Sequence, residues 1–187
     1  MSSAKNNKQE MLRHIFFVLV ENRSGVLARV AGLFSARGFN IESLTVAETD
    51  DPQVSRMTIV VCGDDRIMDQ VRKQLGKLID VHEVHDFSIE TRDIVDRELI
   101  LIKVAVKDGR ERSEILQIAD VYRAKIVDLS EDSMILRGTG AEGKIEALLR
   151  CLGPYNVVEV ARSGRVAMAR GLRNGQAETA EPVLEAV

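Results

Sequence analysis

Apolar residues in the first part of the chain follow strand-like spacing and then helical spacing. His14–Val20 is a mostly apolar, β-branched run, which is typical of a strand buried on both faces. From Val26 the apolar positions recur at helical intervals, with Ser24 as a candidate N-cap and Gly38 as the residue that ends the helix. The sequence therefore predicts a buried strand followed by a helix.

A hairpin, a second helix and a fourth strand follow. The runs Asn40–Ala47 and Val54–Cys62 are joined by a segment with an Asp-Asp-Pro turn, which predicts two paired strands. Asp64 or Asp65 can cap the second helix, and Val81–Ile89 predicts the fourth strand. The predicted apolar face of this helix consists of Ile67, Val71, Leu75 and Leu78. The element order of this half is therefore βαββαβ.

The second half of the chain repeats this order about 85 residues later. Its predicted strands and helices are, in chain order, Leu99–Val106, Glu111–Arg123, Ile126–Leu129, Ser133–Arg137, Gly140–Leu152 and Val157–Ala161. A split βαββαβ unit folds as a four-stranded antiparallel sheet with both helices on one face. The sequence therefore predicts an α+β protein made of two tandem ferredoxin-like βαββαβ domains.

Two polar tails flank the predicted domains. We expect a flexible tail at residues 1–10, a first domain at residues 11–90, a second domain at residues 97–171 and a disordered tail at residues 172–187. Because the strand His14–Val20 is apolar on both sides, the sheet face without helices should be buried against another sheet or another chain. We therefore expect a homodimer.

Composition excludes several classes of partner. The chain has 187 residues, 45% of them hydrophobic, with 26 Lys and Arg against 29 Asp and Glu. With a net charge of −3, no Trp and 4% aromatic residues, it lacks the basic and stacking surfaces of nucleic-acid-binding proteins. No apolar run approaches the roughly 20 residues that span a bilayer, and the first ten residues do not resemble a signal or transit peptide. We expect a cytoplasmic protein without nucleic-acid or membrane partners.

Residues with catalytic or metal-binding chemistry are sparse. Cys62 and Cys151 are isolated in the sequence, which predicts neither a disulfide nor a zinc site. His82 and His85 lie three residues apart in a predicted strand and face opposite sides, and we expect both of them, and His14, to be solvated or at a sheet edge. No nucleophile motif is present. The sequence therefore predicts no catalytic residue, no metal site and no cofactor site in this chain.

The loop between the first strand and the first helix is the one segment with the parts of a ligand site. It places unpaired backbone N–H groups and the positive end of a helix together, where a carboxylate could bind. Gly25 allows close approach of a ligand, Asn22 can donate and accept hydrogen bonds, and Val26 and Leu27 could form an apolar wall. The alternative is that Ser24 caps the helix and Gly25 only turns the chain, and local physics leaves both open.

Four segments of the chain resemble a known family. They are Glu21–Ile59 (ENRSGVLARVAGLFSARGFNIESLTVAETDDPQVSRMTI), Gln74–Val84, Arg97–Val104 and Val158–Gly171. All four are similar to the regulatory small subunit of acetohydroxyacid synthase, also called acetolactate synthase, and the first resembles its amino-terminal ACT domain. The resemblance covers about residues 11–171, leaving only the tails outside it.

The resemblance implies a non-catalytic subunit that activates a catalytic large subunit. That partner would carry the thiamine diphosphate, Mg and FAD. The family also implies dimerisation through the ACT domains and feedback inhibition by a branched-chain amino acid, usually valine, bound between two of them. Carried over to this sequence, the effector site would consist of Asn22, Gly25, Val26, Leu27, Asn40 and Ile41.

Two alternative functions account for the sequence less well. A free-standing ACT-type amino-acid sensor that acts on a different protein would account for the first domain, but the resemblance of the second domain counts against it. A ferredoxin-like RNA-binding protein or small hydrolase conflicts with the charge, the aromatic content and the absent catalytic groups.

Overall fold

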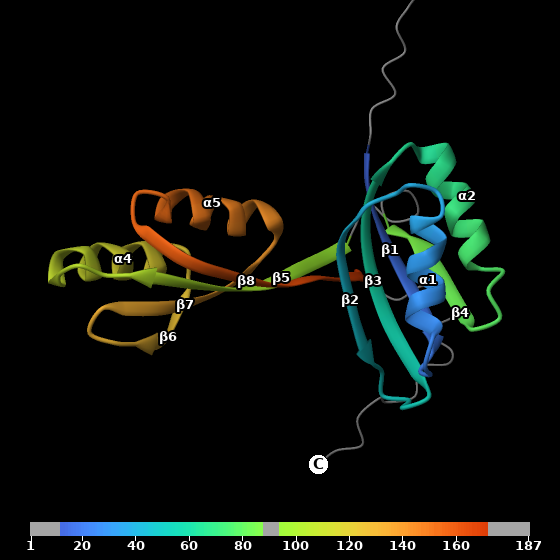
Figure 1. Ribbon diagram of the computed structural model, residues 1–187, viewed down its shortest axis with the longest axis horizontal. Helices are drawn as coiled ribbons and strands as arrows, with labels where there is room; N and C mark the ends of the chain where they lie inside the picture. The colour runs from blue at the N-terminus through green and yellow to red at the C-terminus, as the bar shows by residue number, and fades with distance from the viewer. Residues whose placement is uncertain (1–11, 88–93, 172–187) are drawn as a thin grey trace, which may run out of the picture. The chain divides into compact units, whose positions relative to one another are not determined.

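The computed structural model describes residues 12–87 and 94–171, which form two compact units (Figure 1). The first unit contains the residues up to Val95 together with those from Ala167, and the second contains Asp96–Val166. Each unit has one four-stranded sheet. The predicted tails, residues 1–10 and 172–187, lie outside the described residues.

The first unit has the predicted βαββαβ order. Its elements are β1 (Leu12–Glu21), α1 (Val26–Ser35), β2 (Ile41–Glu48), β3 (Val54–Gly63), α2 (Asp65–Leu75) and β4 (Val81–Asp86). The sheet order is β2-β3-β1-β4, and both helices lie on one side of the sheet (Figure 1). Gly38 has a φ of 73°, and the N–H of Phe39 donates to the carbonyl of Phe34, so the first helix ends where glycine was expected to end it. The ferredoxin-like fold is thereby confirmed.

The main core of this unit lies between the sheet and its two helices. Its central members are aromatic and β-branched side chains of β1 and β3, and Phe16 meets Phe34 of α1 edge to face at 5.9 Å. On α2 the fully buried residues are Met68, Val71 and Leu75, whereas Ile67, which the apolar pattern placed on the buried face, is 42% exposed. The prediction for Ile67 is wrong because α2 presents Met68, Val71 and Leu75 to the sheet.

The centre of the opposite face of the first sheet is also buried, by later segments of the same chain. Ile15, Phe17 and Val60 pack with Phe87 and Ala167 in a second cluster, and Ile94 and Ala169 pack against that cluster. Ala167 and Ala169 are the last part of β8, which belongs to the first unit from Ala167 onward. The apolar character of β1 on both sides therefore does not by itself require a second chain.

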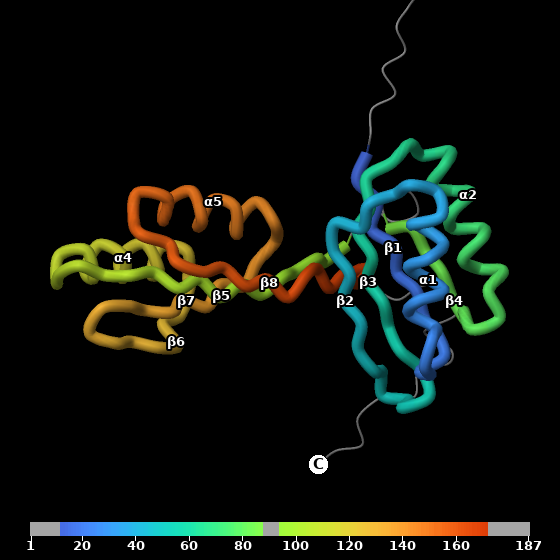
Figure 2. Tube along the Cα trace, in the orientation of Figure 1, coloured from blue at the N-terminus to red at the C-terminus, as the bar shows by residue number. Residues whose placement is uncertain are grey.

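The second unit repeats the order, and its first and last strands, β5 and β8, are the longest. Its elements are β5 (Ile94–Ala105), α4 (Gly109–Val121), β6 (Lys125–Leu129), β7 (Ser133–Gly140), α5 (Glu142–Leu152) and β8 (Asn156–Ala169). The sheet order is β6-β7-β5-β8, and the Cα trace can be followed in Figure 2. The last strand continues for eight residues beyond the predicted Val157–Ala161, so β8 contributes to both units.

His14 is buried in the first unit. It lies on the central strand β1 with no exposed surface, its Nδ1 is 2.6 Å from Asp86 Oδ2, and its Nε2 is 3.2 Å from Asp65 Oδ1. Burial alone would lower the pKa of His14, but the hydrogen bond and charge of Asp86, together with Asp65, raise it above its usual value. The expectation of a solvated or edge histidine is therefore wrong for His14, whereas His82 and His85 do lie on the edge strand β4.

The raised pKa of His14 predicts how stability depends on pH. The protonated ring stabilises the fold fully below about pH 6.5, the unfolded-state value, and this contribution is lost as pH rises through the higher folded-state pKa. We expect the free energy of unfolding of the wild type to fall, relative to that of His14→Asn, as pH rises above about 6.5. Urea denaturation at several pH values measures this difference, with His82→Asn on the exposed side of β4 as the control. Parallel pH profiles for the wild type and His14→Asn would contradict the assignment.

Candidate functional site

The loop between β1 and α1 turns at Gly25. This residue has a φ of 86° and occupies the N-cap position of α1, where no side chain donates or accepts a capping hydrogen bond. The prediction that Ser24 caps the helix is therefore wrong, because the chain enters α1 through a left-handed backbone conformation that favours glycine. The cap position is held by a residue that has no side-chain oxygen.

The start of α1 is consequently open to an anion. No acidic residue lies in the first turn of this helix, all of which is described, and the N–H of Val26 reaches the carbonyl of Arg23 only at 3.4 Å. The first N–H groups of a helix lack intrahelical partners, and the helix dipole makes that end positive. The local geometry therefore favours a carboxylate at the Gly25–Leu27 backbone.

Asn22 fixes the loop to the end of the β2–β3 hairpin. Its Nδ2 donates to Glu48 Oε1 and to the carbonyl of Pro52, both at 2.9 Å, and its backbone N–H donates to the carbonyl of Gln53 at 2.7 Å. Because both amide hydrogens are engaged, the side-chain oxygen is the atom with which Asn22 can receive an ammonium group.

Two arginines add positive charge beside Gly25. Asp80 is buried and accepts hydrogen bonds from Arg23 Nε at 3.1 Å and Arg29 Nε at 2.7 Å. The hydrogen bond from Arg23, helped by Arg29, lowers the pKa of the Asp80 carboxyl, so two cations share one anion. A Cβ on Gly25 would lie 3.2 Å from Arg29 Nη1, which places this guanidinium at the border of the space above Gly25.

Val26 and Leu27 have different surroundings. The side chain of Val26 is 2% exposed and belongs to the core between sheet and helices, whereas Leu27 is 43% exposed. Leu27 can therefore offer an apolar surface to a ligand, while Val26 can contribute only its backbone.

Asn40 and Ile41 lie at the other end of the sheet. Ile41 pairs with Val61 on β3, while Glu21, which precedes Asn22, pairs with Val54 on the same strand. Val54 and Val61 are seven residues apart on β3. At roughly 3.3 Å per residue, Glu21 and Ile41 therefore pair with positions about 23 Å apart along this strand. One chain therefore groups Asn22, Gly25, Val26 and Leu27 at one end of the sheet, and it does not bring Asn40 and Ile41 to them.

Arg29, Asp80 and Glu48 were missed by the sequence analysis. Arg29 could have been found, since it lies one helical turn after Gly25 and its N–H donates to the Gly25 carbonyl at 3.0 Å. Asp80 and Glu48 carry no local signal, because their partners Arg29 and Asn22 lie 51 and 26 residues away in the chain.

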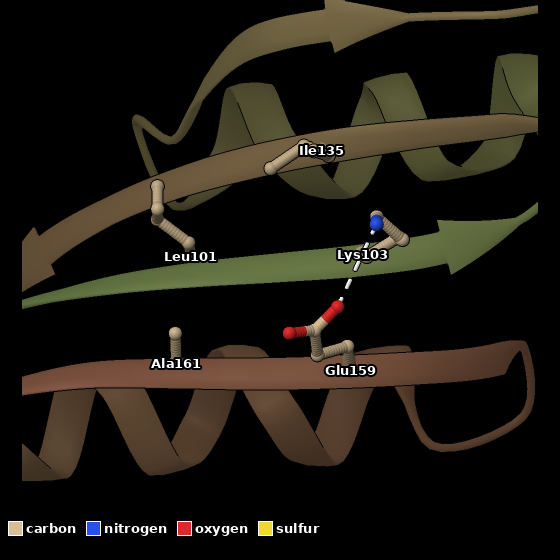
Figure 3. A pocket seen from close by; sticks show the side chains of 5 residues that line it. All are labelled: Leu101, Lys103, Ile135, Glu159 and Ala161. Atoms are coloured by element: carbon tan, nitrogen blue, oxygen red, sulfur yellow. Dashed lines mark ion pairs between the residues drawn. The ribbon is translucent and has the colours of Figure 1, made fainter.

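The second unit has a hollow on the sheet face away from its helices. It has a volume of about 210 Å³ and lies over β5, β7 and β8 (Figure 3). Its lining combines the apolar residues Leu101, Ile135 and Ala161 with Lys103 and Glu159, whose Nζ and Oε2 are 3.5 Å apart. None of the predicted site residues lies there.

Residues 12–87 and 94–171 contain neither a metal-binding cluster nor a membrane-spanning helix. In these ranges no three His, Cys, Asp or Glu side chains are grouped so that they could hold a metal ion. Across the same ranges, no helix combines the length and the apolar character needed to cross a bilayer.

Comparisons with known proteins match both halves of the chain. Residues 97–171 match the family described as small subunit of acetolactate synthase, and residues 16–83 match the AHAS small subunit-like ACT domain. The chain is 46% identical over 163 residues to the acetolactate synthase small subunit of Aquifex aeolicus. This match covers 87% of this chain and 84% of that protein. It is 44% identical over 164 residues to that of Haemophilus influenzae, covering 87% and 99%.

A solved structure agrees with these matches. The crystal structure of the acetolactate synthase small subunit from Thermotoga maritima has a TM-score of 0.79 and 40% sequence identity, covering 87% of this chain and all of that one. The chain belongs to the family of acetolactate synthase small subunits, which are regulatory rather than catalytic.

Proposed function

We propose that this chain activates the catalytic large subunit of acetolactate synthase and makes it sensitive to feedback inhibition by a branched-chain amino acid, with valine as the first candidate. The observation that carries the proposal is the uncapped start of α1 at Gly25, flanked by Arg29 and Asn22. The match of the second half of the chain to the same family counts against a free-standing sensor that acts on another protein.

The loop offers a matching group for each part of an amino acid. The ligand carboxylate would bind the N–H groups at Gly25–Leu27, where Arg29 adds positive charge. The ammonium group would donate to the side-chain oxygen of Asn22. A branched side chain would pack on exposed Leu27 and, from the other half of the site, on Ile41.

A second copy of the chain would complete this site. β2 is an edge strand of the first sheet, and Val46 on it is 40% exposed. Antiparallel pairing of two β2 strands about a two-fold axis would place the start of one strand beside the end of the other. Ile41 of one copy would then lie near Glu48 of the other, and Asn22 of that second copy is hydrogen-bonded to this Glu48. This geometry supports a homodimer with two equivalent sites.

Thiamine diphosphate, Mg and FAD would be bound by the large subunit, and this chain would hold no cofactor of its own. The complex would act in the cytoplasm.

Reconstitution with the large subunit tests the proposal. We expect the two chains to co-purify, the rate of acetolactate formation from pyruvate to rise when this chain is added, and valine to inhibit only the reconstituted complex. The chain alone should show no turnover of pyruvate. A complex that forms but is neither activated nor inhibited by any branched-chain amino acid would contradict the proposal.

A further inference from the structure

Arg56 connects β3 of the first sheet to the end of β8. Its guanidinium carbon lies 4.4 Å from the centre of the Phe17 ring on β1, and its Nη2 donates to the carbonyl oxygen of Ala167 at 2.6 Å. Ala167 is fully buried on this face of the sheet. A charged donor on a buried carbonyl forms a strong hydrogen bond, so Arg56 holds the end of β8 against β3.

Arg56 also lies near the ends of β1 and β2 that flank the candidate effector loop. It is paired with Leu19 on β1 and with Ala47 on β2. Ala47 immediately precedes Glu48, the residue that accepts the hydrogen bond from Asn22. If ligand binding at the loop moved Glu48, the neighbouring Ala47 would move as well, and with it the part of β2 that pairs with Arg56.

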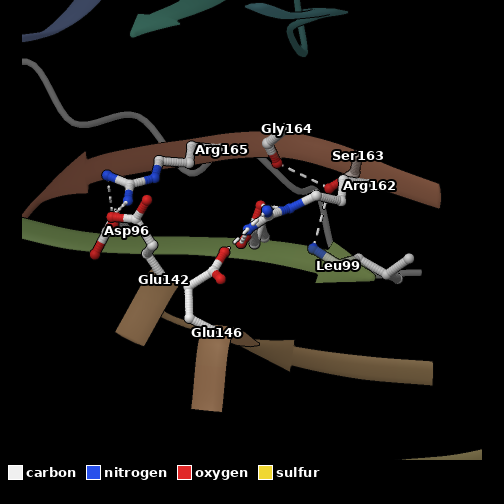
Figure 4. Close-up of polar contacts among 9 residues, drawn as sticks. Asp96, Leu99, Glu142, Glu146, Arg162, Ser163, Gly164 and Arg165 are labelled. Atoms are coloured by element: carbon white, nitrogen blue, oxygen red, sulfur yellow. Dashed lines mark hydrogen bonds and ion pairs between the residues drawn. The ribbon is translucent and has the colours of Figure 1, made fainter. Parts of the chain in front are cut away.

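β8 continues from Ala167 into the second unit without interruption. In that unit Arg165 is paired with Asp96 at 3.5 Å and with Glu142, the first residue of α5 (Figure 4). Arg162 is likewise bound to Glu146 on α5 at 3.0 Å. A shift of β8 at Ala167 would therefore be transmitted to charged contacts with a helix of the second unit.

We propose that Arg56 is a positioning residue that couples occupation of the effector loop to the second unit through the carbonyl of Ala167. This inference rests on the proposed effector function, because it assigns the route by which that site acts. The guanidinium group is suited to the task, since it packs on an aromatic ring and donates to a carbonyl at the same time. A side chain that only filled space at this position would not need an N–H group to donate to the Ala167 carbonyl.

Two substitutions and one control separate coupling from structure. Arg56→Met keeps much of the length and the contact with Phe17 but removes the donor, and Arg56→Lys keeps a cation and a donor. Arg66→Met changes an exposed arginine of α2 and serves as the matched control. Each variant is examined in the full chain by calorimetric titration with valine and, after reconstitution with the large subunit, by the valine concentration that halves activity.

For Arg56→Met we expect valine affinity within about twofold of the wild type and inhibition weakened at least about tenfold, as for the loss of a typical coupling between sites. Arg56→Lys should restore part of the inhibition, and Arg66→Met should behave as the wild type. Amide hydrogen exchange adds a readout without the large subunit. Valine should change exchange in the segment 165–169 of the wild type and leave it unchanged in Arg56→Met.

Three results would overturn the inference in distinguishable ways. Normal inhibition in Arg56→Met with normal valine binding would remove Arg56 from the coupling route. Equal loss of valine binding and inhibition in both Arg56 variants would show that Arg56 maintains the structure of the valine site and does not couple that site to the second unit. If the wild type bound no branched-chain amino acid, the effector proposal itself would fail, and the role of Arg56 would fail with it.

Discussion

Replacing Gly25 by Asp is expected to abolish inhibition by valine while activation of the large subunit is largely kept. The added Cβ would lie 3.2 Å from Arg29 Nη1, so the new carboxylate would occupy the space beside this guanidinium. Like charges a few ångströms apart cost on the order of 1 to 4 kcal/mol at effective dielectric constants between 80 and 20. Such a cost weakens binding of an amino-acid carboxylate about 5- to 1000-fold.

Backbone strain adds to this charge effect. Gly25 has a φ of 86°, a conformation that Asp adopts only at some cost. Gly25→Ala separates the two contributions, because it introduces the strain without the charge and should reduce valine affinity less. Gly32→Asp is the matched control, since it lies on the same helix and a Cβ there would meet no atom within 4 Å.

Titration calorimetry with valine and assays of the reconstituted complex measure the outcome of the Gly25→Asp substitution. Unchanged valine affinity in a folded Gly25→Asp protein would remove the loop from the site. Joint loss of valine binding and activation, with an altered circular dichroism spectrum, would show misfolding and leave Gly25→Ala as the informative variant.

The fold could be predicted because the periodic signals in this chain are local. β1, α1 and the β2–β3 hairpin follow from the alternation of strand and helix spacing, and Asp64 caps α2 by accepting a hydrogen bond from the N–H of Arg66 at 2.9 Å. The burial of His14 could not be predicted in this way. It depends on Asp86, which lies 72 residues away and supplies the hydrogen bond that makes burial of the ring tolerable.

The length of β8 was underestimated for a related reason. Arg162, Ser163 and Gly164 interrupt the apolar pattern after Ala161, so the predicted strand ends there. In the structure these polar residues have partners within the second unit: Arg162 bonds Glu98 and Glu146, and Ser163 Oγ accepts the N–H of Leu99 at 3.0 Å. β8 therefore continues past Ala161 because its polar side chains are hydrogen-bonded, although the apolar pattern ends there.

The candidate site was only half accessible to sequence reasoning. The local physics of a strand–helix loop favours an anion near Gly25, and the structure places Arg29, which is hydrogen-bonded to Asp80, beside this residue. The family resemblance placed Asn40 and Ile41 in the same site, but β-sheet register puts them at the other end of β3 within one chain. In the proposed homodimer, the second copy would bring its Asn40 and Ile41 to the Gly25 loop of the first.

This separation leads to an expected result for mixed dimers. Gly25→Asp damages one half of the proposed site and Asn40→Ala damages the other, so neither homodimer should bind valine. In a dimer with one chain of each kind, the intact loop of the Asn40→Ala chain would meet the intact Asn40 of the Gly25→Asp chain. That dimer should therefore bind one valine, where the wild-type dimer binds two.

A reciprocal dimer makes the test decisive. When one chain carries both substitutions and the other is wild type, each shared site contains one damaged half, so no valine should bind. If instead each chain held a complete site, the results would be reversed: the doubly substituted dimer would bind one valine through its wild-type chain, and the first mixed dimer would bind none. Co-expression with two different affinity tags yields both dimers, light scattering confirms their size, and calorimetry gives the number of sites. A wild-type chain that remained a monomer at micromolar concentration would exclude the shared site altogether, because Asn40 and Ile41 would then have no Gly25 loop within reach.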